Sequence, residues 1–138
     1  MYVLIILSAI LFFIMFLYSG IDKIQHFNDK IKTLDDKFKN NISTPVLKMG
    51  MILVILLEII GPIIIISRLI LAENSPKVLN ILSNITFIGF IIFIILVTIL
   101  YHPFSFNKPI PFLSNCSTLA GIIFLFVISN SNLINNRM

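Results

Sequence analysis

Four long apolar runs determine what this chain can fold into. They lie between charged residues and cover positions 1–21, 49–67, 78–101 and 109–133, with Glu58 as the one charged residue inside the second run. Each run is near or above the ~20 residues that an α-helix needs to cross a hydrocarbon core of ~30 Å. The runs are continuous, whereas a transmembrane β-strand alternates apolar and polar residues. The sequence therefore predicts an all-α membrane protein.

The composition supports a single membrane domain covering residues 1–138. Hydrophobic residues make up 58% of the chain and charged residues 12%, whereas soluble domains are roughly 45–50% apolar. We expect an antiparallel bundle of four transmembrane helices, at about residues 2–21, 46–68, 78–101 and 112–131. The first run lacks a basic stretch before it and a clear cleavage site, so we expect a retained helix rather than a signal peptide. This length leaves no room for the soluble core of a conventional enzyme.

The first loop predicts a further helix, at about residues 22–39. Its apolar residues recur every three or four positions, and lysines and aspartates occupy the other faces. This pattern is typical of an amphipathic helix that lies in the membrane interface with its lysine stems extending toward water. A flexible charged loop is the alternative. The apolar positions are Ile24, Phe27, Ile31, Leu34 and Phe38.

Charged residues indicate the orientation and limit the partners. Seven of the ten lysines and arginines fall on the side of the first and third loops, so the positive-inside rule predicts that these loops are cytoplasmic. The net charge of +4 is spread over short loops without an arginine cluster, which argues against nucleic-acid binding. The expected partner is the lipid bilayer, and a membrane protein partner or a second copy is left open. The single cysteine, Cys116, excludes a redox pair of cysteines within the chain.

Glu58 is the residue that most needs an explanation. It lies ten residues after Lys48 and ten before Arg68, which is about 15 Å from each along a helix and close to the membrane midplane. An ionised carboxylate there costs about 2.5–3.5 kcal/mol, so we expect it to face the bundle interior, to pair with a donor or to stay protonated. One interpretation is a buried hydrogen-bonding post. The other is a protonatable group that contacts a ligand, a quinone or a proton path.

Small residues and one proline predict where the spans pack closely or bend. Pro62 lacks the N–H that would bond to the Glu58 carbonyl, and its ring crowds that carbonyl, so a bend is expected. Glycines let a neighbouring helix approach closely. The positions predicted to set packing or a kink are Gly20, Gly61, Pro62 and Gly121.

Three further polar residues lie at span ends, on the side of the first and third loops: Lys23, His102 and Asn115. Antiparallel neighbours would gather them around the deeper Glu58, which predicts a polar cavity opening on that side. Lys23 is free to reach a carboxylate on another span or a lipid headgroup. The alternatives are an interfacial anchor for His102 and a helix–helix clamp for Asn115. A direct contact between Glu58 and His102 is not expected, and no metal site is predicted.

These positions carry a family resemblance. The chain resembles the DoxX-like family of small four-helix membrane proteins at Gly20, Lys23, Glu58, Gly61, His102 and Asn115. The resemblance covers nearly the whole chain, although each motif has only one or two residues. It implies either a link to quinone-coupled membrane redox complexes or a role as a chaperone or assembly factor. The long first loop and Pro62 depart from the family pattern.

Three functions follow as hypotheses. The first is a subunit of a quinone-linked membrane redox complex that is not catalytic alone, because the chain has no recognisable cofactor motif and a quinone is implied only by the resemblance. The second is a structural, assembly or chaperone membrane protein whose polar residues fix helix packing. The third, a small transporter, is disfavoured because a single deep carboxylate makes a poor proton relay. Whether the chain is an enzyme is left open.

Overall fold

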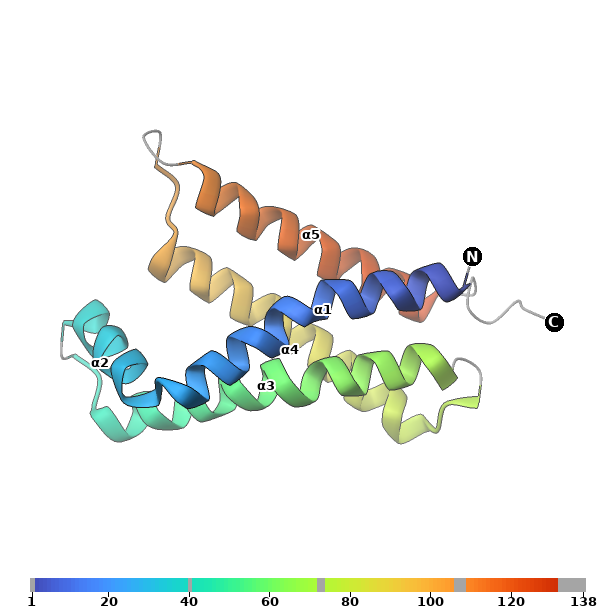
Figure 1. The fold of residues 1–138 in the computed structure, drawn as a ribbon, viewed down its shortest axis with the longest axis horizontal. Coiled ribbons are helices and arrows are strands. Elements are labelled where there is room, and N and C mark those ends of the chain that lie inside the picture. Colours follow the sequence, from blue (N-terminus) through green and yellow to red (C-terminus); the bar gives the residue numbers. More distant parts are fainter. Residues whose placement is uncertain (1, 40, 72–73, 106–108, 132–138) are drawn as a thin grey trace.

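Five α-helices form the part of the chain that the computed structural model describes, residues 2–39, 41–71, 74–105 and 109–131. They are α1 (Tyr2–Gln25), α2 (Phe27–Phe38), α3 (Thr44–Leu71), α4 (Lys77–Tyr101) and α5 (Ile110–Asn130) (Figure 1). No strand occurs among these residues. By length and composition, α1, α3, α4 and α5 can each cross a membrane. The predicted all-α class with four membrane-length helices is confirmed, which indicates a multi-pass integral membrane protein.

The helices extend past the predicted spans. α1 continues to Gln25, beyond the predicted end at residue 21, and α3 covers residues 44–71 instead of 46–68. The predicted boundaries followed the charged residues. A lysine near a helix end can nevertheless hold its ammonium group in polar surroundings while its stem lies beside apolar side chains. Lys23 therefore belongs to α1 and not to the helix expected in the first loop.

The long helices pack in the order α1–α3, α3–α4 and α4–α5. Consecutive members of this series run in opposite directions in Figure 1. Phenylalanines form much of the hydrophobic core: Phe13, Phe87 and Phe90 are fully buried, and Phe16 is 4% exposed. The rings of Phe16 and Phe90 meet at a centroid distance of 4.8 Å with an edge-on geometry, which links α1 to α4 across α3.

Residues 27–38 of the predicted first loop, which carry the amphipathic pattern, form α2. The apolar side of α2 packs against the start of α3. Ile31 of α2, Leu47 and Met51 of α3 are buried together, with Phe27 and Leu34 partly buried beside them. The expected helix is therefore present over residues 27–38, because residues 22–25 complete α1. Its apolar face is therefore partly covered by α3, through the hydrophobic contacts that its sequence pattern provides.

Glycines lie where helices touch most closely. A Cβ added to Gly61 would lie 2.8 Å from Cε2 of Phe90, so α3 and α4 can approach at this point only without a side chain. A Cβ added to Gly121 would lie 2.7 Å from Cε2 of Phe12, which brings α5 close to α1 at that level. α3 continues as a helix through the buried Pro62. The bend expected at Pro62 stays a prediction.

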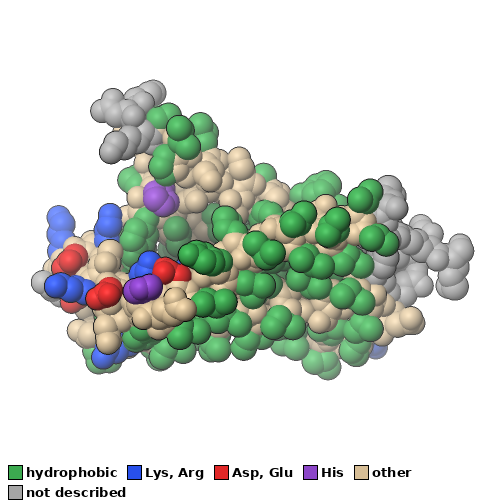
Figure 2. Space-filling model, viewed as in Figure 1, with side chains coloured by type: hydrophobic (Ala, Val, Ile, Leu, Met, Phe, Trp, Pro, Cys, Tyr) green, Lys and Arg blue, Asp and Glu red, His purple; other side chains and the backbone are tan. Residues whose placement is uncertain are grey.

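The outer surface is apolar along the long helices and charged at one end. Large hydrophobic side chains are open on every long helix, for example Leu11 (63% exposed), Ile63 (57%), Ile99 (65%) and Phe124 (65%). Figure 2 shows hydrophobic side chains along the length of the molecule and most of the charged ones gathered toward the end that carries α2. Soluble monomers rarely expose so much contiguous apolar surface, whereas a bilayer covers it.

Candidate functional site

The deep carboxylate of Glu58 meets a lysine from the neighbouring helix. Lys23 Nζ on α1 donates to both Oε1 and Oε2 of Glu58 on α3, each at 2.8 Å. Ser19 Oγ donates to Oε1 at 3.2 Å and accepts a hydrogen bond from Lys23 Nζ at 2.6 Å. The three protons of the ammonium group therefore all have acceptors. We call Ser19, Lys23 and Glu58 the α1–α3 polar cluster.

Local sequence explains this geometry. Ser19 and Lys23 are four residues apart on α1, so they lie one above the other on the same face. Between them Gly20 lets α3 come close, because a Cβ on Gly20 would lie 2.8 Å from Cγ1 of Ile59 and 3.2 Å from Cβ of Glu58. The predicted close approach at Gly20 thus falls at the polar cluster itself. A larger residue there would push the carboxylate away from Ser19 and Lys23.

The cluster is shielded from solvent on its carboxylate side. Glu58 is 1% exposed, whereas the Lys23 side chain keeps 18% of its surface exposed. The Phe93 ring of α4 covers the lysine, with its centroid 6.0 Å from Nζ. Aromatic faces attract an ammonium group. α1, α3 and α4 therefore all contribute to the surroundings of one ion pair.

A paired Glu58 behaves differently from a lone one. Each charge neutralises the other, so the pair can lie in an apolar region that would disfavour either group alone. Both carboxylate oxygens are engaged by Lys23, and one of them also by Ser19. Such an arrangement is suited to holding two helices at a fixed spacing and rotation. Proton exchange with a ligand would first require the pair to open.

The other two candidates do not join this cluster. His102 follows the last residue of α4, is half-buried, and its backbone N–H donates to the Thr98 carbonyl at 3.0 Å. Asn115 is on α5, and among the described residues its buried Nδ2 has no hydrogen-bond partner. This nitrogen therefore makes no helix–helix clamp among these residues, and a clamp through the amide oxygen of Asn115 stays a prediction. Of the four predicted residues, the structure joins only Lys23 and Glu58 by a hydrogen bond or ion pair in the described part of the chain.

The sequence analysis did not anticipate two polar side chains that form hydrogen bonds between helices. Ser19 was not among the candidates, although its spacing of four from Lys23 places it on the same helix face. Arg68 was treated as the flank of a span, yet it is 9% exposed, and its Nη2 donates to the Ser129 carbonyl of α5 at 3.4 Å. The signal for Arg68 was present, because the apolar run continues after it as Leu69, Ile70 and Leu71.

Charged groups also fix the corner between α1 and α2. Lys30 Nζ of α2 lies 2.7 Å from Asp22 Oδ2 of α1, and His26 Nδ1 lies 3.1 Å from Asp22 Oδ1. Farther along α2, Lys37 Nζ lies 5.3 Å from the centroid of the Tyr101 ring at the end of α4. These side chains are more exposed than Glu58, so each contact stabilises the fold less.

The described residues hold no metal centre, and a pocket lies away from the polar cluster. No group of three or more His, Cys, Asp or Glu side chains is placed to hold a metal ion in residues 2–39, 41–71, 74–105 and 109–131. A pocket of about 280 Å³ lies between α1 and α5, and its lining includes none of Lys23, Glu58, His102 and Asn115. The predicted polar cavity around these four residues stays a prediction.

Comparison with protein-family models, curated proteins and solved structures finds no match for this chain. The resemblance to the DoxX-like family therefore rests on the quoted residues alone. What the chain does has to be argued from its own contacts.

Proposed function

We propose that this chain is a structural or assembly component of a membrane, in which the α1–α3 polar cluster fixes how the spans pack. One observation carries the proposal: Glu58 is 1% exposed, and both of its oxygens accept hydrogen bonds from Lys23 at 2.8 Å. These contacts support the first interpretation of Glu58, a buried hydrogen-bonding group that fixes the packing of two helices. Its partner comes from another span, so the pair specifies which helices meet and in which register.

The proposal includes an arrangement in the bilayer. α1, α3, α4 and α5 cross as an antiparallel bundle, and α2 lies at the membrane interface beside the start of α3. This is supported by the charged side chains of α2, by its contact with Leu47 and Met51, and by the apolar surface along the long helices. The excess of basic residues on the side of the first and third loops supports a cytoplasmic position for that end.

A quinone-linked redox role is the competing hypothesis, and it makes a different demand on Glu58. Such a role needs a carboxyl group that exchanges protons with a bound ligand. In the structure, the Glu58 carboxylate instead accepts hydrogen bonds from Lys23 and Ser19. A substitution of Glu58 should therefore give different results under the two hypotheses.

The test compares Glu58→Gln with Glu58→Leu in the full chain, reconstituted in lipid vesicles. Gln keeps hydrogen-bonding capacity toward Ser19 and Lys23, whereas Leu keeps none. We expect Gln to retain a large part of the folded, membrane-inserted protein and Leu to lose most of it, as measured by thermal aggregation and protease resistance. The matched control is Lys30→Gln, which removes a more exposed ion pair with Asp22.

The decisive contrast is with added ubiquinone. If Glu58→Gln leaves stability unchanged but abolishes quinone binding shown by the wild type, the structural proposal fails and the redox role replaces it. If the wild type binds no quinone and stability follows the hydrogen-bonding capacity at position 58, the structural role holds.

A further inference from the structure

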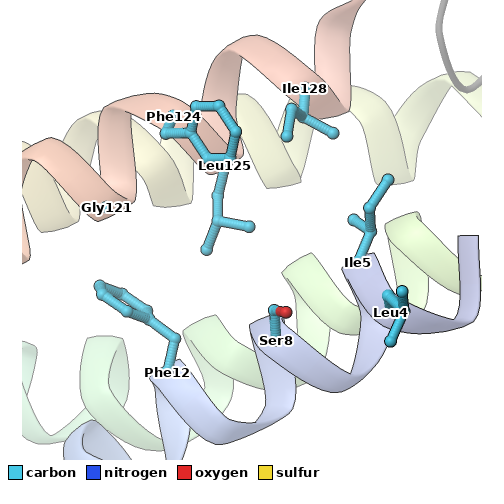
Figure 3. A pocket seen from close by; sticks show the side chains of 8 residues that line it. All are labelled: Leu4, Ile5, Ser8, Phe12, Gly121, Phe124, Leu125 and Ile128. Atoms are coloured by element: carbon cyan, nitrogen blue, oxygen red, sulfur yellow. The ribbon is translucent and has the colours of Figure 1, made fainter. Parts of the chain in front are cut away.

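An apolar groove lies between α1 and α5, away from the polar cluster. Its volume is about 280 Å³. Figure 3 shows Leu4, Ser8 and Phe12 of α1 on one side, with Leu125 and Ile128 of α5 on the other. Every lining side chain is apolar except the hydroxyl of Ser8, so the groove has no charge with which to hold a polar ligand.

The groove follows from how the helices are connected. Close packing runs from α1 to α3, from α3 to α4 and from α4 to α5, so α1 and α5 are the two ends of the series. They approach each other at Phe12 and Gly121, where a Cβ would lie 2.7 Å from the ring. Toward the N-terminal end of α1, the short side chain of Ser8 leaves the space open.

The size of the groove favours a narrow occupant. Its volume is about 280 Å³, and from Leu4 to Phe12 the helix along one side of it rises about 12 Å. An α-helix with its side chains is about 10–12 Å wide, so a stretch of helix of that length occupies about 900 Å³ and would not lie within the groove. A single extended hydrocarbon chain is much thinner than a helix and can lie there.

The surroundings supply such a chain. Both helices that line the groove belong to the candidate membrane spans, and its rim residues Leu4 (64% exposed) and Phe124 (65%) are open to the outside of the bundle. In a bilayer this opening faces lipid tails. Filling the groove restores the van der Waals contacts that an empty space of this size would lose.

We propose that the groove is a binding site for one acyl chain of a bilayer phospholipid, which packs between α1 and α5 and stabilises their separation. The chain enters from the side, lies along Ser8 and reaches toward Phe12, whose ring next to Gly121 closes that end. Leu125 is only 6% exposed and forms part of the inner wall. The proposal concerns lipid binding and does not depend on the role of Glu58.

The test uses phosphatidylcholine vesicles in which a fraction of the lipid carries a photoreactive diazirine in one acyl chain. After illumination of the reconstituted full chain, mass spectrometry locates the adducts. We expect labelling of Leu125 and Phe12 in addition to the exposed α1 residues Leu11 and Ile14. Bulk lipid reaches the exposed residues but not a wall residue that is 6% exposed.

Two variants fill the groove from opposite sides, Ser8→Leu and Ile128→Phe. Each is expected to lower labelling at Leu125 by about fivefold while labelling at Leu11 stays unchanged, because the filled space excludes the lipid tail. The matched control is Ser117→Leu, the same change at an exposed serine of α5 that does not line the groove. Because the two variants alter different helices, misfolding of one does not remove the test.

Three results would overturn the proposal. Labelling confined to exposed residues would mean contact with bulk lipid only. Unchanged labelling of Leu125 in both filled variants would place the lipid elsewhere. Disulfide-linked dimers formed by the variant Ser8→Cys, in a Cys116→Ser background, would show that a second copy occupies the groove.

Discussion

Replacing Lys23 with methionine tests the α1–α3 polar cluster most directly, because it removes the ammonium group and keeps much of the stem. The change leaves the carboxylate of Glu58 buried at 1% exposure with only the Ser19 hydroxyl, at 3.2 Å, as donor. Breaking a buried ion pair from one side costs about 3–5 kcal/mol. Protonation of the orphaned carboxyl limits the loss, since insertion of an acidic residue costs about 2.5–3.5 kcal/mol. We therefore expect the free energy of unfolding to fall by about 2.5–3.5 kcal/mol.

Unfolding in mixed detergent micelles, followed by circular dichroism, measures this loss. The matched control is Lys30→Met, whose ion pair with Asp22 has side chains 42% and 34% exposed, so a change below about 1 kcal/mol is expected. Combining Lys23→Met with Glu58→Met should recover most of the loss, because two apolar side chains of similar size can replace a buried pair. A Lys23→Met loss no larger than that of the control, with no recovery in the double variant, would refute the reasoning.

Three further changes test the packing. Gly61→Ala should cost about 1–3 kcal/mol in unfolding free energy because its Cβ meets the Phe90 ring, whereas Gly50→Ala, with open space around it, should cost nothing. Ile31→Ala should destabilise the contact of α2 with α3 by about 2–4 kcal/mol and speed proteolysis between them, while Lys32→Ala should not. Asn115→Leu should be neutral or stabilising, since its buried Nδ2 has no partner in the described residues, and a marked loss of stability would revive the clamp.

Much of the fold could be predicted because its cause is local. Continuous apolar runs predict four membrane-length helices, and a repeat of three or four residues predicts a helix in the first loop. That helix was expected at the membrane interface, and part of its apolar face packs on Leu47 and Met51 of α3. Periodicity identifies an apolar face but not what covers it, because lipid tails and leucine side chains are equally apolar.

The polar site was predicted only in part, for a related reason. The depth of Glu58 indicated that it needed a donor, and Lys23 was one of several within reach. The choice among them depended on Gly20, which brings α3 close to α1 at the level of the carboxylate. His102 and Asn115 share the expected end of the bundle but belong to α4 and α5, which diverge from α1 there in Figure 1. Span ends on one side of a membrane need not converge.

Helix packing predicts a depth for Glu58 that differs from the midplane position indicated by the sequence. Gly20 lies level with Glu58 because a Cβ on it would be 3.2 Å from the Glu58 Cβ. Gly20 is near the end of the 24-residue α1, about 10 Å from its centre. On α4, Phe90 lies next to the helix centre and beside Gly61. These levels put the centre of the bundle near residues 61–65 of α3, and α2 covers the part of α3 that extends beyond α1.

The two possible depths of Glu58 differ in which of two lipid-facing residues of α3 lies closer to the membrane centre. These residues are Leu56 (47% exposed) and Ile63 (57%). With Glu58 at the midplane, Leu56 would lie about 3 Å from the centre and Ile63 about 8 Å from it. With the centre near Ile63, Leu56 lies about 10 Å away, toward the end that carries α2.

Nitroxide labels at these positions, in a Cys116→Ser background, report depth through collisions with oxygen and with a water-soluble nickel complex. We expect Ile63 to be the deeper position. That order places the Lys23 ammonium group nearer the membrane surface than the midplane, and its stem of several carbons still lets it pair with the buried carboxylate of Glu58. The reverse order would return Glu58 to the midplane.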